Sequence, residues 1–203
     1  MAVADRVEEG LHWWRSGRPE AALLPISAAI DATVQAEYGL SKGTKSSYKQ
    51  WLRENTWVVC VAGLRQILTP KIMVPALHPD LNPDANGRCD LTDVLYHVVR
   101  CGLVHQADIS KFIGFSADII LGCEPPRYVV ADTLPLGLAV AAILSPANAG
   151  ALLANDSVIP IWQWQFGVNS LWGQREMLAG FVGEAVKRRM TDREMREGSS
   201  GVV

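Results

Sequence analysis

An arginine and a histidine that could act together occur in the segment Arg100–His105, which reads RCGLVH. A permanent guanidinium charge beside an imidazole, whose unperturbed pKa is about 6.5, suits metal-free cleavage of RNA. His105 would act as general base on the ribose 2′-hydroxyl or as general acid on the leaving 5′-oxygen. Arg100 would neutralise the charge that develops on the phosphorane. The pair therefore predicts a ribonuclease site that requires neither a metal nor an enzyme nucleophile.

The spacing of this pair requires a particular backbone geometry. On an ideal α-helix, residues five apart point about 140° away from each other. Gly102 makes a bend between the two side chains credible, because glycine is unfavourable inside a helix. A two-fold dimer would also bring two such pairs together. The alternative is a surface arginine and a helix-end histidine with separate, structural roles.

A metal site is a rival interpretation of the same segment. His97, Cys101 and His105 are spaced at i, i+4 and i+8, and Cys89 lies upstream. Three ligands over two helical turns span about 12 Å, which is too far for one tetrahedral zinc site. At most one pair with ligands from elsewhere would bind a metal, and Cys101 is otherwise expected to pack as a small apolar residue. We therefore predict no metal and no cofactor.

Three further side chains, Asp31, Tyr96 and Cys101, are candidates for supporting the pair. Asp31 lies in an otherwise apolar helical face, and a buried carboxylate needs a partner, for which Arg100 or His105 would serve. Tyr96, one turn before Arg100, could orient the guanidinium or simply pack in the core. Cys101 directly follows Arg100.

A basic stripe at helical spacing is the candidate RNA-binding surface. With two interleaved aromatic residues, Tyr48 and Trp51, it could follow a phosphate backbone. The alternative is the solvated face of an amphipathic helix. The stripe consists of Lys42, Lys45, Lys49 and Arg53.

Hydrophobic periodicity predicts the elements that must position these residues. Helices are expected at about 3–15, 19–38 (with a kink or break near Pro25), 43–68, 90–106, 134–144 and 170–190. The proline-rich segment 71–88 is expected to be a surface loop. Segments 112–122 and 128–131 are expected to form a two-stranded hairpin joined by 124–127, and Trp162, Trp164 and Phe166 alternate as in a strand or packed arm. The chain is thus predicted to be mainly α with a small β-hairpin appendage, as one domain over 1–190 and a flexible tail over 191–203.

Composition limits the function classes. The 203 residues are 49% hydrophobic, with 20% charged residues and a net charge of −2, so a global positive field for nucleic acid is excluded. No signal peptide and no uninterrupted apolar run of membrane-spanning length is visible. The four cysteines form no CxxC pair, which favours reduced thiols and a cytoplasmic protein. Nucleotide-hydrolase, dinucleotide-binding and zinc-protease motifs are also missing.

The segment Leu95–His105, LYHVVRCGLVH, resembles the R-x4-6-H motif of the HEPN superfamily (higher eukaryotes and prokaryotes nucleotide-binding domains). It is most similar to bacterial members that read LYxxVRCGLVH. Softer similarity in ALLPISAAIDATVQAEYG, in YKQWLREN and in the SPAN turn extends the resemblance over about residues 20–150. Many active members carry Asn, Asp or His where this chain has Cys101.

The HEPN resemblance implies a helical bundle that forms a homodimer with Arg100 and His105 in a shared cleft. It implies a metal-independent endoribonuclease of a toxin–antitoxin or phage-defence system, with RNA as substrate and an antitoxin or other protein as partner. Other members have lost catalysis and only bind or scaffold, and that is the alternative function here.

Overall fold

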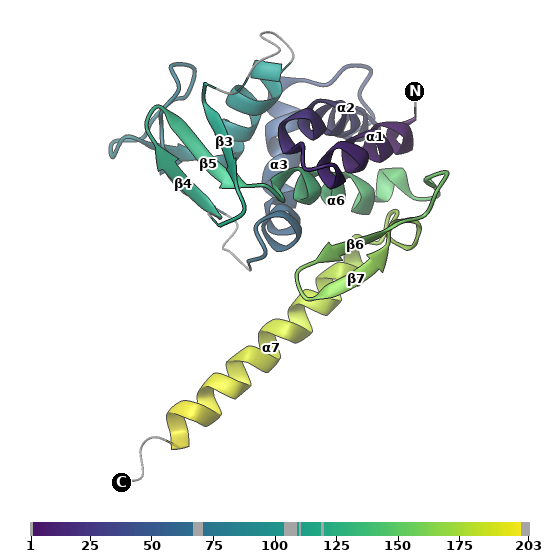
Figure 1. Cartoon of the computed structure of the whole chain (residues 1–203), viewed down its shortest axis with the longest axis vertical. Helices are drawn as coiled ribbons and strands as arrows, with labels where there is room; N and C mark the ends of the chain where they lie inside the picture. The colour runs from purple at the N-terminus through teal and green to yellow at the C-terminus, as the bar shows by residue number, and fades with distance from the viewer. Residues whose placement is uncertain (1, 67–70, 104–108, 110, 119, 200–203) are drawn as a thin grey trace.

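The computed structural model describes residues 2–66, 71–103, 109, 111–118 and 120–199, with side chains up to Arg188. Over these residues the chain is mostly helical with small sheets, as the sequence predicts. Figure 1 shows a helical body, a sheet on one side of it, and a hairpin followed by a long helix on the other. No helix in the described ranges combines the length and apolar composition needed to span a bilayer.

Four α-helices form the body: α1 (Val3–Arg15), α2 (Pro19–Glu37), α3 (Lys45–Gly63) and α6 (Leu134–Leu144). Helix α6 is the centre of the bundle and packs against the other three. All of its residues are buried, which explains why it reads as a continuous apolar run instead of an amphipathic stripe.

Helices α3 and α6 cross at a pair of glycines. A Cβ atom on Gly137 would lie 2.7 Å from the Cα of Gly63, so the backbones meet at a distance that only glycine allows. The Thr133 hydroxyl donates a hydrogen bond to the Gly63 carbonyl at the same crossing. The crossing therefore fixes the position of α3 on the central helix.

One predicted helix boundary is wrong. Helix α2 has the predicted bounds to within one residue and continues through the buried Pro25, so its first turns are not a separate helix. Helix α3 ends at Gly63 instead of near Leu68, and Arg65 then adopts a positive φ of 51° that leaves the helix.

The sheet consists of β3 (Ile113–Ser116), β4 (Leu121–Glu124) and β5 (Arg127–Ala131) in the order β3-β5-β4. Strands β4 and β5 form the predicted hairpin, but β3 is a separate strand that pairs parallel to β5. The expected two-stranded arrangement was therefore too simple, because the buried strand β5 is paired on both edges.

The predicted loop 71–88 is partly extended. Strand β1 (Met73–Pro75) pairs antiparallel with β2 (Arg88–Asp90). The Tyr128 hydroxyl of β5 holds this segment by donating to the Pro75 carbonyl (2.7 Å) and accepting from the Leu77 amide (2.8 Å). These long-range bonds explain why a proline-rich segment is ordered here.

The chain ends in a second hairpin and a long helix. Strands β6 (Val158–Ile161) and β7 (Trp164–Gly167) pair antiparallel, which gives the aromatic alternation its strand form. Two short 3₁₀ turns, at Pro146–Asn148 and Val168–Ser170, flank the hairpin. Helix α7 (Arg175–Ser199) then projects from the body (Figure 1) and continues past the predicted end at residue 190.

A half-buried carboxylate links the first turn of α7 to the body. Glu37, at the end of α2, accepts hydrogen bonds from Arg175 Nη2 (3.0 Å), Trp51 Nε1 (2.9 Å) and Ser145 Oγ (2.7 Å). Burial disfavours its charge, but these donors outweigh burial and lower the pKa of Glu37. Trp51 is therefore a core residue and is not the stacking platform that the basic stripe suggested.

Candidate functional site

Arg100 lies on a π-helix rather than on the predicted α-helix. Asp90 caps the short helix α4 (Leu91–Val94) by accepting a hydrogen bond from the Thr92 amide at 2.8 Å. The chain then continues as the π-helix η1 (Leu95–Cys101). π-helical turns are rare and are frequently found at functional sites.

The predicted bend at Gly102 is wrong. Gly102 has helical dihedrals, φ −58° and ψ −47°, and continues the helix beyond η1. Glycine is needed there for another reason, since a Cβ atom would lie 2.9 Å from Cγ2 of Ile109. Gly102 is therefore a packing residue, and the wider π-helical turn is what departs from α-helical geometry.

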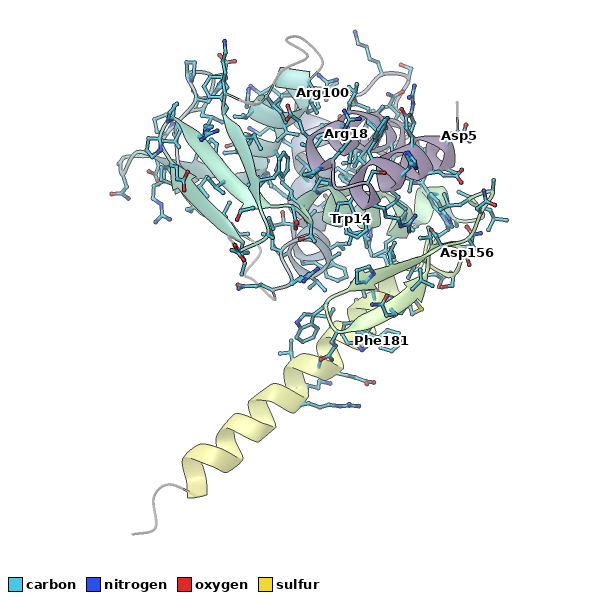
Figure 2. The ribbon with its side chains drawn as sticks, viewed as in Figure 1. Asp5, Trp14, Arg18, Arg100, Asp156 and Phe181 are labelled. Atoms are coloured by element: carbon cyan, nitrogen blue, oxygen red, sulfur yellow. The ribbon has the colours of Figure 1, made fainter. Side chains whose placement is uncertain are left out.

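The guanidinium of Arg100, labelled in Figure 2, lies between η1, α2 and α3. Its Nη2 is 3.3 Å from Oδ2 of Asp31, and its Cζ lies 6.0 Å and 5.8 Å from the ring centroids of Tyr48 and Tyr96. The Arg100 side chain is 24% exposed, so it is mostly but not completely covered. The structure thus brings together three of the residues singled out in the sequence, Asp31, Tyr96 and Arg100.

The charges of this pair are shifted by their surroundings. Burial works against the charge of Arg100, but the neighbouring Asp31, Cys101 and Tyr96 together outweigh burial, and the pKa of Arg100 rises. Burial also raises the pKa of Asp31, against the attraction of Arg100. Arg100 therefore remains a cation at every physiological pH, and its Nε has no hydrogen-bond partner among the described residues.

The remaining residues near Arg100 that the sequence singled out are His105, Cys101 and Tyr48. His105 lies outside the described residues. Cys101 is half-buried, and its thiol lies beside both Arg100 and Tyr96. Tyr48 was noted in the sequence only as an aromatic residue within the basic stripe. The structure instead places it, fully buried, against Arg100.

Three of the four residues of the basic stripe line one open groove at the start of α3. Lys45, Lys49 and Arg53 line it together with Thr44, Ser46 and Gln50, and its volume is about 700 Å³. Lys49 forms an ion pair with Asp93, and Arg53 Nη2 lies 3.8 Å from the same carboxylate. Lys42 is exposed in the loop before α3 and does not line the groove. We call the surface formed by Lys45, Lys49 and Arg53 the α3 groove.

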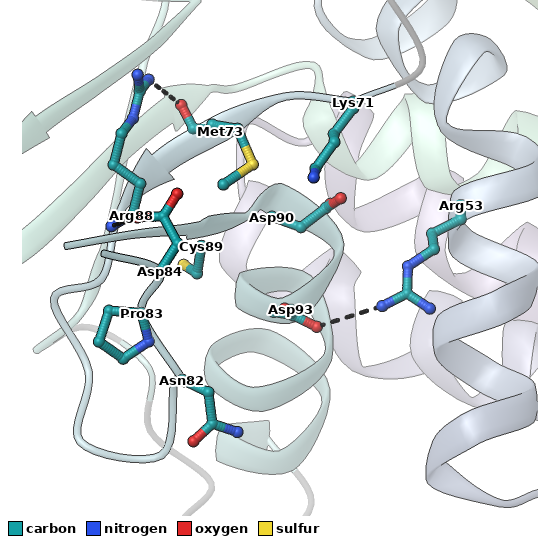
Figure 3. Close-up of a pocket in the computed structure, with 10 residues that line it drawn as sticks. All are labelled: Arg53, Lys71, Met73, Asn82, Pro83, Asp84, Arg88, Cys89, Asp90 and Asp93. Atoms are coloured by element: carbon teal, nitrogen blue, oxygen red, sulfur yellow. Dashed lines mark hydrogen bonds and ion pairs between the residues drawn. The ribbon is translucent and has the colours of Figure 1, made fainter. Parts of the chain in front are cut away.

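A second cavity of about 600 Å³ adjoins the α3 groove through Arg53 (Figure 3). Figure 3 shows the Arg88 guanidinium directed away from Arg53, toward the main-chain oxygen of Met73 to which it donates a hydrogen bond. The cavity is lined by three cationic side chains and by three carboxylates. These are Arg53, Lys71 and Arg88, and Asp84, Asp90 and Asp93. Because its charges balance, this cavity offers less attraction to an anion than the α3 groove does.

His97 is a residue of η1 that the sequence suggested only as a metal ligand. It is half-buried, and burial together with the charges of Lys45 and Lys49 lowers its pKa, so it is neutral at pH 7. Among the described residues, no group of three or more His, Cys, Asp or Glu side chains is arranged to hold a metal ion.

Comparison with known proteins gives a family. The Rv1289 family model matches residues 2–198, which is almost the whole chain, and the chain belongs to this family. No curated protein and no solved structure shows significant similarity to the chain.

Proposed function

We propose that this member of the Rv1289 family is a metal-independent endoribonuclease of the HEPN type, with Arg100 and His105 as its catalytic residues. The observation that carries the proposal is the position of Arg100. A partly exposed, permanently charged guanidinium lies on a π-helix that packs against the helix carrying the α3 groove. The helical bundle formed by α1, α2, α3 and α6 is compatible with a HEPN-like fold.

The proposed reaction uses the substrate's own nucleophile. The ribose 2′-oxygen loses its proton to a base and attacks the adjacent phosphorus, and the bond from phosphorus to the 5′-oxygen breaks. The leaving oxygen takes up a proton, so the products are a 2′,3′-cyclic phosphate and a 5′-hydroxyl. His105 supplies the base or the acid, and Arg100 stabilises the additional negative charge on the phosphorane.

The surroundings of Arg100 suit this role. Asp31 and the rings of Tyr48 and Tyr96 fix the guanidinium before substrate arrives, so little reorganisation is needed in the transition state. Lys45, Lys49 and Arg53 would hold neighbouring phosphates, and Lys42 would extend this contact from the preceding loop. In this proposal the protein acts in the cytoplasm as a homodimer, and an antitoxin or another protein controls it.

A second candidate function is a HEPN-like dimer that binds RNA or protein without catalysis. The ion pair between Arg100 and Asp31 favours it, because a guanidinium that already has a carboxylate partner is well placed for a structural role. The two functions differ in whether RNA is cleaved and not in whether it is bound.

The test is incubation of the full chain with single-stranded and structured RNA in EDTA, beside His105→Ala and Arg100→Ala. His12→Ala is the matched control, since this histidine lies on α1 and lines a separate pocket. Cleavage by the parent and the control alone, with 2′,3′-cyclic phosphate ends, is the expected result. Retention of RNA binding without any cleavage would favour the second candidate function. Equal cleavage by all variants would show that neither Arg100 nor His105 is catalytic.

A further inference from the structure

A cavity of about 660 Å³ lies at the corner where α1 turns into α2. Its walls come from four separate parts of the chain. They include Trp13 of α1, Leu24 of α2, Leu103 just after η1, and Phe115 of β3. Leu24 is 52% exposed, so the cavity opens to solvent along an apolar wall. We call it the Trp13 cavity. Its size is typical of a ligand site, and its lining combines apolar side chains with the charged groups of Glu9, Arg18 and Glu20.

The backbone of this corner is fixed before any ligand binds. The amides of Gly17 and Arg18 donate to the carbonyls of Trp14 and Trp13, each at 3.0 Å, and Gly17 has a positive φ of 71°. The turn brings the Arg18 guanidinium, labelled in Figure 2, to 4.6 Å from the Trp13 ring centroid. The guanidinium thus covers one face of the indole, and this preorganised pair lowers the entropic cost of binding a flat ligand against it.

Two carboxylates at the cavity define what kind of flat ligand fits. Glu9 is already paired with Arg6 at 3.0 Å. Glu20, in the first turn of α2, lines the cavity and has no partner within the described part of the chain. A carboxylate beside aromatic walls accepts hydrogen bonds from exocyclic amino groups, such as those of adenine and cytosine, and uracil has no such group. Aromatic rings and guanidinium planes are the surfaces on which unpaired bases stack.

We propose that the Trp13 cavity binds an unpaired nucleobase that carries an exocyclic amino group. The base stacks against the pair in which the Arg18 guanidinium covers the Trp13 indole, and its amino group donates to Glu20. The inference rests on the proposed function, because it assigns the base to the RNA strand that passes Arg100.

Two helices connect this cavity to the Arg100 site. Leu103 follows Arg100 by only three residues, and Asp31 follows Leu24 by seven residues, about 10 Å along α2. A few nucleotides of one strand can span such distances. The cavity would therefore select an unpaired base close to the phosphate that Arg100 contacts, and duplex RNA would not satisfy it.

The test measures binding separately from cleavage. Fluorescein-labelled 2′-O-methyl oligoadenylate and oligouridylate cannot be cut through the 2′-hydroxyl, and fluorescence anisotropy gives their affinities for the full chain. We expect the parent to prefer oligoadenylate. Trp13→Ala should weaken its binding between about fivefold and about a hundredfold, as stacking losses do. Trp13→Phe should retain most of the affinity, which separates loss of stacking from loss of fold.

Two matched controls and one spectroscopic readout complete the experiment. Trp164→Ala removes a tryptophan of β7 that packs against Phe181 of α7 and should leave binding unchanged. Glu20→Ala should reduce the preference for adenine over uracil, whereas Glu176→Ala, in the first turn of α7, should not. With 5-fluorotryptophan incorporated, AMP should shift the fluorine resonance that disappears in Trp13→Phe.

The outcomes separate this inference from the proposed function. Binding that depends on Trp13, without any cleavage of natural RNA, would support the nucleobase site and contradict the proposed ribonuclease activity. Cleavage of RNA, with an affinity that does not change when Trp13 or Glu20 is substituted, would overturn the nucleobase site and support the ribonuclease activity. Saturation of the cavity by an apolar peptide, with no response of the Trp13 resonance to AMP, would also overturn it.

Discussion

At the scale of single residues, Arg100 is held as a planar cation and not merely as a positive charge. Its guanidinium lies over Tyr48 and Tyr96 and donates to Asp31. An ammonium group has neither the planar face nor the fork of donors that this environment fits. The site therefore selects arginine over lysine.

Arg100→Ala should lower the rate of RNA cleavage by about 10²–10³-fold, the usual loss when one donor to a developing charge is removed. Arg100→Lys should not restore the rate, since lysine loses the contacts with both rings. Initial rates in EDTA measure the effect, with Arg188→Lys as control because Arg188 is 81% exposed on α7. An Arg100→Lys variant with the parent's rate would show that only the charge matters.

Glu37 gives the fold a pH dependence. Its pKa is lowered in the folded state, so its contribution to stability is complete above its ordinary pKa of 4.5 and is lost as the pH falls through the lowered value. Glu37→Gln should cost about 1.5–3 kcal/mol at pH 7, as is usual for hydrogen bonds to a charged group, and remove this part of the acid sensitivity. Urea denaturation at pH 7 and below pH 4.5 tests this. Glu184→Gln is the control, and its exposed pair with Arg188 predicts little change at either pH.

The sequence predicts the partner of Asp31 better than it predicts the whole site. A carboxylate in an apolar helical face requires a partner, and the structure supplies Arg100. Tyr48 and Asp93 could not be assigned in this way, because their contacts join α3 to the helix segment that follows Asp90. Such contacts depend on how two helices pack against each other. The spacing of residues within one helix carries no information about that packing.

At the scale of elements, the crossing of α3 and α6 depends on two residues without side chains. Gly137→Ala should destabilise the protein by about 1–3 kcal/mol, because the new methyl group would meet the backbone of Gly63, which cannot move aside as a side chain can. Thermal denaturation measures the loss. Gly183→Ala, on the exposed part of α7 with nothing within 4 Å of the new Cβ, should instead stabilise by about 0.5–1 kcal/mol. Equal effects of the two changes would contradict the crossing.

The limits of the sequence prediction are clearest in η1 and the sheets. The apolar spacing predicts a helix after Asp90, and one is present, but π- and α-helical turns differ by one residue and the same pattern fits both. The parallel pairing of β3 with β5 and the short pair β1–β2 are set by partners far along the chain. Long amphipathic and fully apolar helices, by contrast, carry their own signal, as α1 and α6 do.

At the scale of the whole molecule, a net charge of −2 provides no overall attraction for RNA, so in the proposed function the cations of the α3 groove must provide it. If its three cations each displace one counterion from single-stranded RNA, the logarithm of affinity should fall with the logarithm of salt with a slope of about −2. Lys45→Gln should reduce the magnitude of the slope by about 0.7. Anisotropy titrations over a range of salt concentrations measure this, with Lys111→Gln as control. A slope that does not change with Lys45→Gln would place the RNA elsewhere.

The projecting helix α7 also affects how this protein can be handled. Its 25 residues span about 37 Å, and its first turn is tied to α2 through Arg175 and Glu37. A fluorophore or affinity tag attached near Ser199 would be held away from the helical body by a stiff arm without an engineered linker. A small rotation at Arg175 would be magnified into a large displacement at the tip, so a donor–acceptor pair between Ser199 and the body would detect motions too small to follow at the root.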